Sequence, residues 1–192
     1  DFIIYKYDYY ADGTKKINGL ISTTIDPNGN KTEYIYKDDT CDLSQKIEYY
    51  IEEKTEKSNI TKYEYDSVGR KKSVTTPSNI KTEYEYDAMS NLVRTVVSET
   101  TGEKRKSVTR VLYDQYNRIV QEISPKQYDP AKDGLNRTPK TQTYDDTNVG
   151  SRYTYYDDGR LKTFTDAENN QTIYTYNAVG NIDTETKPNK SV

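Results

Sequence analysis

Short runs in which aromatic and polar residues alternate recur along the whole chain, and one of them is Tyr63-Glu64-Tyr65. Neighbouring side chains on a β-strand point to opposite faces, so residues two apart share a face. Both rings of this run would therefore lie on one face and Glu64 on the other. The pattern predicts short β-strands with one aromatic face and one hydrated face.

Each run is followed by residues that favour a tight turn. In Asp66-Ser67-Val68-Gly69 the carboxylate can accept bonds from backbone N–H groups two residues on, and the glycine tolerates a left-handed conformation. A return strand then ends in a second turn, as at residues 26–30 (Asp-Pro-Asn-Gly-Asn) and 166–170 (Asp-Ala-Glu-Asn-Asn). Strand, turn, strand, turn is the pattern of tandem antiparallel β-hairpins, so we predict an all-β fold.

The unit recurs at a regular interval. The residues from Tyr63 reappear in related form 21 residues later at Tyr84, and those from Tyr153 reappear 21 residues later at Tyr174. We predict a single array over residues 1–192, with copies starting near residues 5, 34, 63, 84, 111, 153 and 174. An irregular insertion at about residues 125–149 holds one extra hairpin at most. The aromatic positions that define the copies are Tyr5, Tyr7, Tyr34, Tyr36, Tyr63, Tyr65, Tyr84, Tyr86, Tyr113, Tyr153, Tyr155, Tyr174 and Tyr176. The turn positions are Asp66, Gly69, Arg70, Asp87, Asn91, Asp114, Arg118, Gly159, Arg160, Gly180 and Asn181.

Composition changes the picture of the core. Mean hydropathy is −1.09, 32% of the residues are hydrophobic and 31% are charged, values that lean towards disorder. Against this, 21 tyrosines and 2 phenylalanines supply large apolar surfaces. We therefore predict a core built from tyrosine, with each ring packed against a ring of the next hairpin. Exposed rings that stack on sugars or on an unfolded cargo are the alternative.

Charge and cysteine content exclude several classes of protein. A net charge of −3 leaves no basic surplus for binding nucleic acid. No apolar run approaches the roughly 20 residues of a membrane span. Cys41 is the single cysteine, so an internal disulfide or a multi-cysteine metal site cannot form.

The residues for common catalytic sites are missing. The chain has no histidine, which removes Ser-His and Cys-His pairs and histidine-containing metal sites. Carboxylate doublets such as Asp157-Asp158 would point to opposite faces of a strand and would not flank one bond. Asp26, Asn28 and Asn30 resemble the start of a calcium loop, but Gly29 and Lys37 stand at the wrong places in that pattern. We predict a protein that is not an enzyme, with no catalytic residue, cofactor or metal site.

Each copy has about 21 residues and begins with the pattern Y-x-Y-D-x-x-G-R, which is followed by an aliphatic residue and a second turn. This pattern resembles the YD repeats of the RHS family. That family includes bacterial polymorphic toxins, cell-wall-associated proteins, the cocoon subunits of toxin complexes, and teneurins. The resemblance implies a curved, spiralling sheet of hairpins that forms a hollow shell, which in several relatives encapsulates a C-terminal toxin. It implies adjacent repeats of the parent protein and an encapsulated toxin domain as partners.

We therefore expect a structural segment of the shell or stalk of a large secreted or cell-surface protein. The chain starts at Asp1 and reads as a fragment whose secretion signal lies outside it. Richness in Lys, Asn, Tyr and Ile is typical of AT-rich genomes and favours a Gram-positive bacterium. Unpaired strands at the two ends of the array favour homo-oligomers. The alternative is a module that binds carbohydrate or cell-wall glycan through aromatic hairpin repeats, although such modules are rich in tryptophan and this chain has none.

Overall fold

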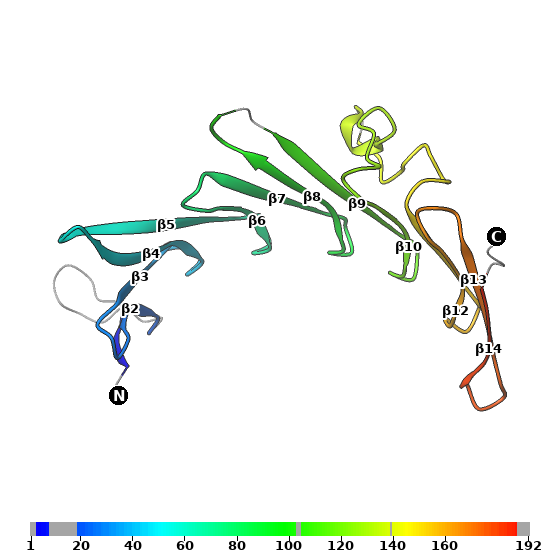
Figure 1. The fold of residues 1–192 in the computed structure, drawn as a ribbon, viewed down its shortest axis with the longest axis horizontal. Helices are drawn as coiled ribbons and strands as arrows, with labels where there is room; N and C mark the ends of the chain where they lie inside the picture. The colour runs from blue at the N-terminus through cyan, green and yellow to red at the C-terminus, as the bar shows by residue number, and fades with distance from the viewer. Residues whose placement is uncertain (1–2, 8–18, 103–104, 139, 188–192) are drawn as a thin grey trace. The chain divides into compact units, whose positions relative to one another are not determined.

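The computed structural model describes residues 3–7, 19–102, 105–138 and 140–187, and these form one antiparallel sheet whose strand order follows the chain. Figure 1 shows the successive hairpins. The strands are β1 (Ile4–Tyr7), β2 (Ile21–Ile25), β3 (Lys31–Tyr36), β4 (Leu43–Glu52), β5 (Thr55–Tyr65), β6 (Lys71–Thr75), β7 (Ile80–Tyr86), β8 (Leu92–Glu99), β9 (Lys106–Tyr113), β10 (Ile119–Ile123), β11 (Ser151–Tyr155), β12 (Leu161–Thr165), β13 (Gln171–Tyr176) and β14 (Ile182–Thr186). The predicted all-β fold of tandem antiparallel hairpins is confirmed.

The chain divides into two compact units, which are described separately. One comprises Asp1–Glu83 and Val97–Lys106, and the other comprises Tyr84–Val96 and Ser107–Val192. Asp8 follows the first tyrosine pair, and Pro188 stands at the second-turn position of the last copy; both lie outside the described residues. No helix in the described part of the chain is long and apolar enough to cross a membrane.

The aromatic runs close the odd-numbered strands. Tyr63 and Tyr65 end β5, and the corresponding tyrosines end β1, β3, β7, β9, β11 and β13. After Glu64, which pairs with Ser73, the partner of Tyr65 is Lys71, so the return strand carries one extra residue. The same shift occurs in the hairpins β1–β2, β3–β4, β9–β10, β11–β12 and β13–β14. Each of these is a β-bulge, which twists the strands locally next to the turn.

One turn conformation recurs at both ends of the hairpins. In the turn Asp66–Arg70, the Asp66 N–H donates to the Arg70 carbonyl at 2.8 Å and the Gly69 N–H donates to the Asp66 carbonyl at 3.1 Å. Gly69 has φ +83°, the left-handed region that a glycine enters at little cost. The same backbone bonds form in the turns that begin at Asp26, Asp66, Thr76, Asp87, Asp114, Tyr156, Asp166 and Asn177.

The β4–β5 hairpin was not predicted. Its strands have 10 and 11 residues, and Glu53 and Lys54 form its two-residue turn with φ of +50° and +66°. Two successive left-handed residues match the twist of a hairpin, but this turn normally uses asparagine and glycine. Glu-Lys is not a typical sequence for such a turn, so the sequence did not predict this hairpin.

The buried core differs from the expected tyrosine core. The buried hydrophobic side chains among the described residues are Val93, Val96, Val108, Ile123, Leu135 and Tyr144, of which one is aromatic. Leu135 and Tyr144 come from the insertion, which supplies the apolar cover that a single-layer sheet lacks.

Among the described residues of the insertion there is no extra hairpin. These residues form a short 3-10 helix, Gly134–Asn136, and an isolated bridge between Asp133 and Tyr144. Gly134 is packed so closely that a Cβ atom there would lie 2.1 Å from the Thr141 hydroxyl oxygen. The backbone is held by local hydrogen bonds, such as Gly134 N–H to the Thr143 carbonyl at 2.9 Å, and not by a ladder.

Candidate functional site

The second tyrosine of several motifs joins its hairpin to the preceding one. The Tyr176 hydroxyl donates to the Leu161 carbonyl at 2.9 Å, and the Tyr36 hydroxyl donates to the Ile21 carbonyl at 3.0 Å. The Tyr155 hydroxyl donates to the Ile119 carbonyl at 2.7 Å, and Tyr113 makes the equivalent bond to Leu92 at 3.4 Å. Each acceptor is the first residue of a return strand. We call this hydrogen bond the tyrosine clasp.

The clasp supplies a donor to a carbonyl that lies beyond the end of the ladder between two hairpins. The β12–β13 ladder pairs Thr163–Thr165 with Gln171–Ile173, and Leu161 lies beyond its end. A carbonyl left unpaired and shielded from water would cost free energy. The long side chain of Tyr176 reaches this carbonyl across the gap between the strands.

The arginine of the turn supports the clasp from the neighbouring hairpin. The Arg118 Nε donates to Asp114 at 2.7 Å, and its guanidinium lies 4.4 Å from the Tyr155 ring centroid. Arg160 lies in the same way over Tyr176, at 4.7 Å. A guanidinium over an aromatic face is attracted by the ring quadrupole. In the copy that starts at Tyr153, Tyr155 thus contacts the preceding hairpin and Arg160 contacts the next one.

The acidic turn residue is held in its charged form. The carboxylate of Asp114 accepts N–H bonds from Tyr116 at 2.8 Å and from Arg118 at 3.0 Å. Burial raises the pKa of Asp114, but these bonds and the Arg118 guanidinium lower it more, so the net shift is downward. In the copy that starts at Tyr153, Tyr156 occupies the first turn position and Asp158 binds Arg160 instead.

Direct ring contacts between hairpins are less general than expected. Between hairpins, Tyr156 and Tyr176 meet edge to face with centroids 6.1 Å apart. Tyr153 packs within its own hairpin on Phe164 at 5.3 Å, and its hydroxyl donates to Glu122 at 2.5 Å. Burial and this carboxylate raise the pKa of Tyr153 well above its ordinary value. The expectation of a continuous ladder of rings is corrected, because hydroxyl and guanidinium contacts make most of the described connections.

The opposite face carries paired polar side chains. Ser73 donates to Glu64 at 2.7 Å, and the hydroxyls of Thr154 and Thr163 lie 2.7 Å apart. Arg94 forms an ion pair with Glu85, the residue between Tyr84 and Tyr86. This face is therefore polar, as the alternation indicated, but over β8–β10 the insertion covers it.

A buried ion pair attaches the insertion to this face. Arg110 and Asp133 are both 0% exposed, and Arg110 Nε lies 3.1 Å from Asp133 Oδ1. Arg110 also donates to the Val93 carbonyl at 2.7 Å, and Tyr128 donates to Asp133 at 2.8 Å. Burial raises the pKa of Asp133, but the Leu135 N–H, the Tyr128 hydroxyl and Arg110 outweigh it and hold that pKa below its ordinary 3.8. Sequence analysis missed this pair because its partners are 23 residues apart.

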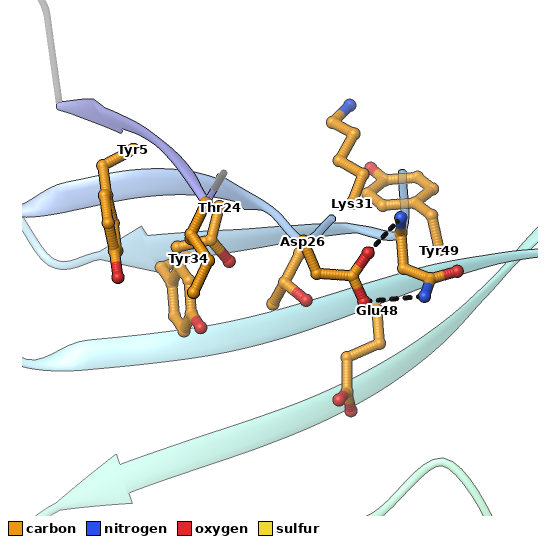
Figure 2. A pocket seen from close by; sticks show the side chains of 10 residues that line it. Tyr5, Thr24, Asp26, Lys31, Tyr34, Glu48 and Tyr49 are labelled. Atoms are coloured by element: carbon orange, nitrogen blue, oxygen red, sulfur yellow. Dashed lines mark hydrogen bonds between the residues drawn. The ribbon is translucent and has the colours of Figure 1, made fainter. Parts of the chain in front are cut away.

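A groove lies in the N-terminal part of the chain, near the turn Asp26–Asn30. We use the name tyrosine face for the face of the sheet from which Tyr5 and Tyr34 extend. The groove encloses about 580 Å³ and is lined by Tyr5, Thr24, Thr32, Tyr34 and Glu48, together with Ile3, Asp26, Asn30, Lys31 and Tyr49. Figure 2 shows Tyr5, Tyr34 and Glu48 extending from one face of the sheet, whereas Lys31 and Tyr49 extend from the other.

The structure places the predicted residues in two groups. The tyrosines lie on the odd-numbered strands, and the turn residues lie at the adjoining turns. Asn91 and Asn181 stand where Arg70 stands in its copy, and Asn91 donates to Asn117 of the next hairpin at 2.9 Å. No cluster of three His, Cys, Asp or Glu side chains within the described ranges could hold a metal ion.

A known family matches part of the repeated sequence. The family described as RHS Repeat matches residues 65–104 and 155–192. In these two segments the chain carries RHS repeats. In both matched segments the family pattern begins at the second tyrosine of a motif, Tyr65 or Tyr155, and runs through the Asp-to-Gly turn. A search of curated proteins gave no significant match.

Solved structures share the fold of this RHS-repeat chain. A crystal structure of TcdB2-TccC3-TEV has a TM-score of 0.64 at 18% identity, over 91% of this chain and 9% of that chain. TcdB2-TccC3-Cdc42 has a TM-score of 0.54 at 11% identity, over 96% of this chain and 10% of that chain. TcdB2-TccC3 without its hypervariable C-terminal region has a TM-score of 0.53 at the same identity and coverage. The RHS-repeat chain thus spans about a tenth of the length of these structures.

Proposed function

We propose that this chain forms part of the wall of a large secreted or cell-surface protein, and that the wall encloses a C-terminal toxin or effector domain. The RHS repeats and the fold shared with TcdB2-TccC3 support a structural repeat segment. Two of the matched crystal structures are of TcdB2-TccC3-TEV and TcdB2-TccC3-Cdc42, and a third is of TcdB2-TccC3 without its hypervariable C-terminal region. The same repeat fold is thus found in proteins whose C-terminal region varies, as we propose for the parent protein.

The tyrosine clasp is the observation that carries this proposal. A wall one sheet thick has no second layer to bury its side chains against, so hydrophobic burial alone cannot hold it together. The clasps at Tyr36, Tyr113, Tyr155 and Tyr176 connect neighbouring hairpins with groups that tolerate water. The low mean hydropathy of −1.09 is compatible with a sheet that meets water on both faces.

The use of the carboxylates supports a non-catalytic role. Asp26, Asp66, Asp114 and Asp166 each accept backbone N–H bonds within their own turn, and the pKa of each is lowered. A general acid needs a carboxyl group whose pKa is raised towards neutrality. These groups are shifted in the opposite direction.

Limited proteolysis of the full-length parent protein tests the proposal. We expect the segment that follows the repeats to be cleaved about tenfold more slowly in the intact protein than when it is expressed alone. Weakening one clasp by the double substitution Arg118→Ala and Tyr155→Phe should increase cleavage, whereas Tyr50→Ala, on an exposed strand end, should not. Equal cleavage of the intact protein and the isolated segment would rule out an enclosing wall.

A further inference from the structure

The groove near the turn Asp26–Asn30 has tyrosine side chains in its lining. Tyr5 is 51% exposed, and neither its hydroxyl nor that of Tyr34 bonds to a residue that the structure describes. Tyr153, by contrast, is packed on Phe164 and bonded to Glu122. The groove therefore offers tyrosine side chains that are at least partly exposed to solvent.

The lining residues form a row across four strands. Tyr5 on β1 pairs with Thr24 on β2, Thr24 pairs with Thr32 on β3, and Thr32 pairs with Glu48 on β4. Strands in a sheet are about 4.8 Å apart, so the row extends over roughly 14 Å. A ligand that meets both ends is longer than a single sugar unit. The row presents an aromatic ring, two hydroxyls and a carboxylate in succession.

The local charges favour a neutral ligand. Glu48 lies 2.8 Å from Lys46 in an ion pair, and Asp26 is engaged by its own turn. No excess of positive charge is present to attract a phosphate or a sulfate. Carboxylate and hydroxyl oxygens are suited to accept hydrogen bonds from sugar hydroxyl groups.

An extended peptide fits the groove less well. Peptides that dock on a sheet pair with an exposed edge strand through backbone hydrogen bonds. The floor of the groove is formed by β2 and β3, which are each paired on both sides. A ligand here must be recognised through side chains, and the positive C–H edges of a pyranose are suited to the negative faces of the tyrosine rings.

We propose that this groove binds a neutral oligosaccharide, with Tyr5 and Tyr34 as stacking platforms and Thr24, Thr32 and Glu48 as partners of its hydroxyl groups. The site does not depend on the wall function, since a wall segment can carry a glycan site on either face. Loss of one property would leave the other intact.

Titration with the neutral trisaccharide N,N′,N″-triacetylchitotriose (called chitotriose below) tests this proposal. Tyrosine fluorescence and calorimetry measure the binding. Because the chain has no tryptophan, the fluorescence reports tyrosine directly. We expect saturation below about 20 mM, and at least about fivefold weaker binding for Tyr5→Ala and Tyr34→Ala, as loss of a stacking ring requires. Trigalacturonate, which is anionic, should bind at least about fivefold more weakly than chitotriose.

Two further variants keep the test independent of folding. Tyr5→Phe retains the ring and should retain binding, and Glu48→Gln should weaken it without changing the melting temperature. Tyr50→Ala is the matched control, since Tyr50 is an exposed tyrosine of the same unit outside the groove. Failure to saturate, equal binding by Tyr5→Ala and the unchanged chain, or competition by an unfolded polypeptide would each overturn the proposal.

Discussion

The hydroxyl group of Tyr155 lies 2.7 Å from the carbonyl oxygen of Ile119, although the whole insertion separates the two residues in sequence. In the β12–β13 pair the same bond joins residues only 15 apart. β10 and β11 pair directly, and their ladder includes Gln121 with Arg152. The insertion therefore leaves the array uninterrupted and projects from one face of it.

Removing a clasp hydroxyl should weaken the sheet by a measurable amount. We expect Tyr155→Phe to lower the free energy of unfolding by about 0.5–1.5 kcal/mol, because the Ile119 carbonyl loses its donor. Urea denaturation followed by circular dichroism measures the change. Tyr50→Phe, at a tyrosine 39% exposed, is the control and should have little effect. Equal values for the two variants would show that the clasp contributes nothing.

The left-handed turn residue should be more sensitive than its neighbour. We expect Gly69→Val to destabilise by about 1–3 kcal/mol, because a β-branched residue is strained at φ +83°. A Cβ atom at Gly69 would meet nothing within 4 Å, so the cost arises from the backbone and not from a clash. Ser67→Ala should change stability by less than about 0.5 kcal/mol. Thermal unfolding of both variants compares them, and similar losses would contradict the turn assignment.

The buried ion pair should show strong coupling. We expect Arg110→Met or Asp133→Leu alone to lower the free energy of unfolding by about 3–5 kcal/mol. Asp133→Leu leaves the buried Arg110 without its carboxylate, and Arg110→Met leaves the buried Asp133 with Arg94 as its remaining ion-pair partner. The double variant should lose clearly less unfolding free energy than the two single variants added together, because neither charge of the pair remains. A double-mutant cycle by chemical denaturation gives the coupling free energy. Strict additivity would indicate that the two side chains act independently.

Acid should detach the insertion through Asp133. Its pKa is lower in the folded protein than its ordinary 3.8, so its contribution to stability is complete above that value and is lost as the pH falls through the lower folded pKa. The ionisable groups that face Asp133 are Arg94, Arg110 and Tyr128. We expect Asp133→Asn to flatten the decline in stability below about pH 4. Unfolding curves of both proteins between neutral and strongly acidic pH test this, and parallel declines would exclude Asp133 as a contributor.

The sequence by itself determined the hairpin array. Two local properties reveal it: the tyrosines of a motif are two residues apart, and the residues from Asp66 to Gly69 favour a tight turn. Both can be recognised without knowing what packs against them. The resemblance to RHS repeats rested on the same local features and agrees with the matched segments.

Only the tertiary structure decided which groups meet across hairpins. The pairing of Tyr155 with Ile119, the Arg110–Asp133 pair and the row from Tyr5 to Glu48 depend on register and on the placement of the insertion. Such contacts join residues far apart in sequence, whose proximity no periodicity encodes. The buried core therefore consists mainly of aliphatic side chains, because burial follows from which surfaces are covered and not from which residues are most abundant.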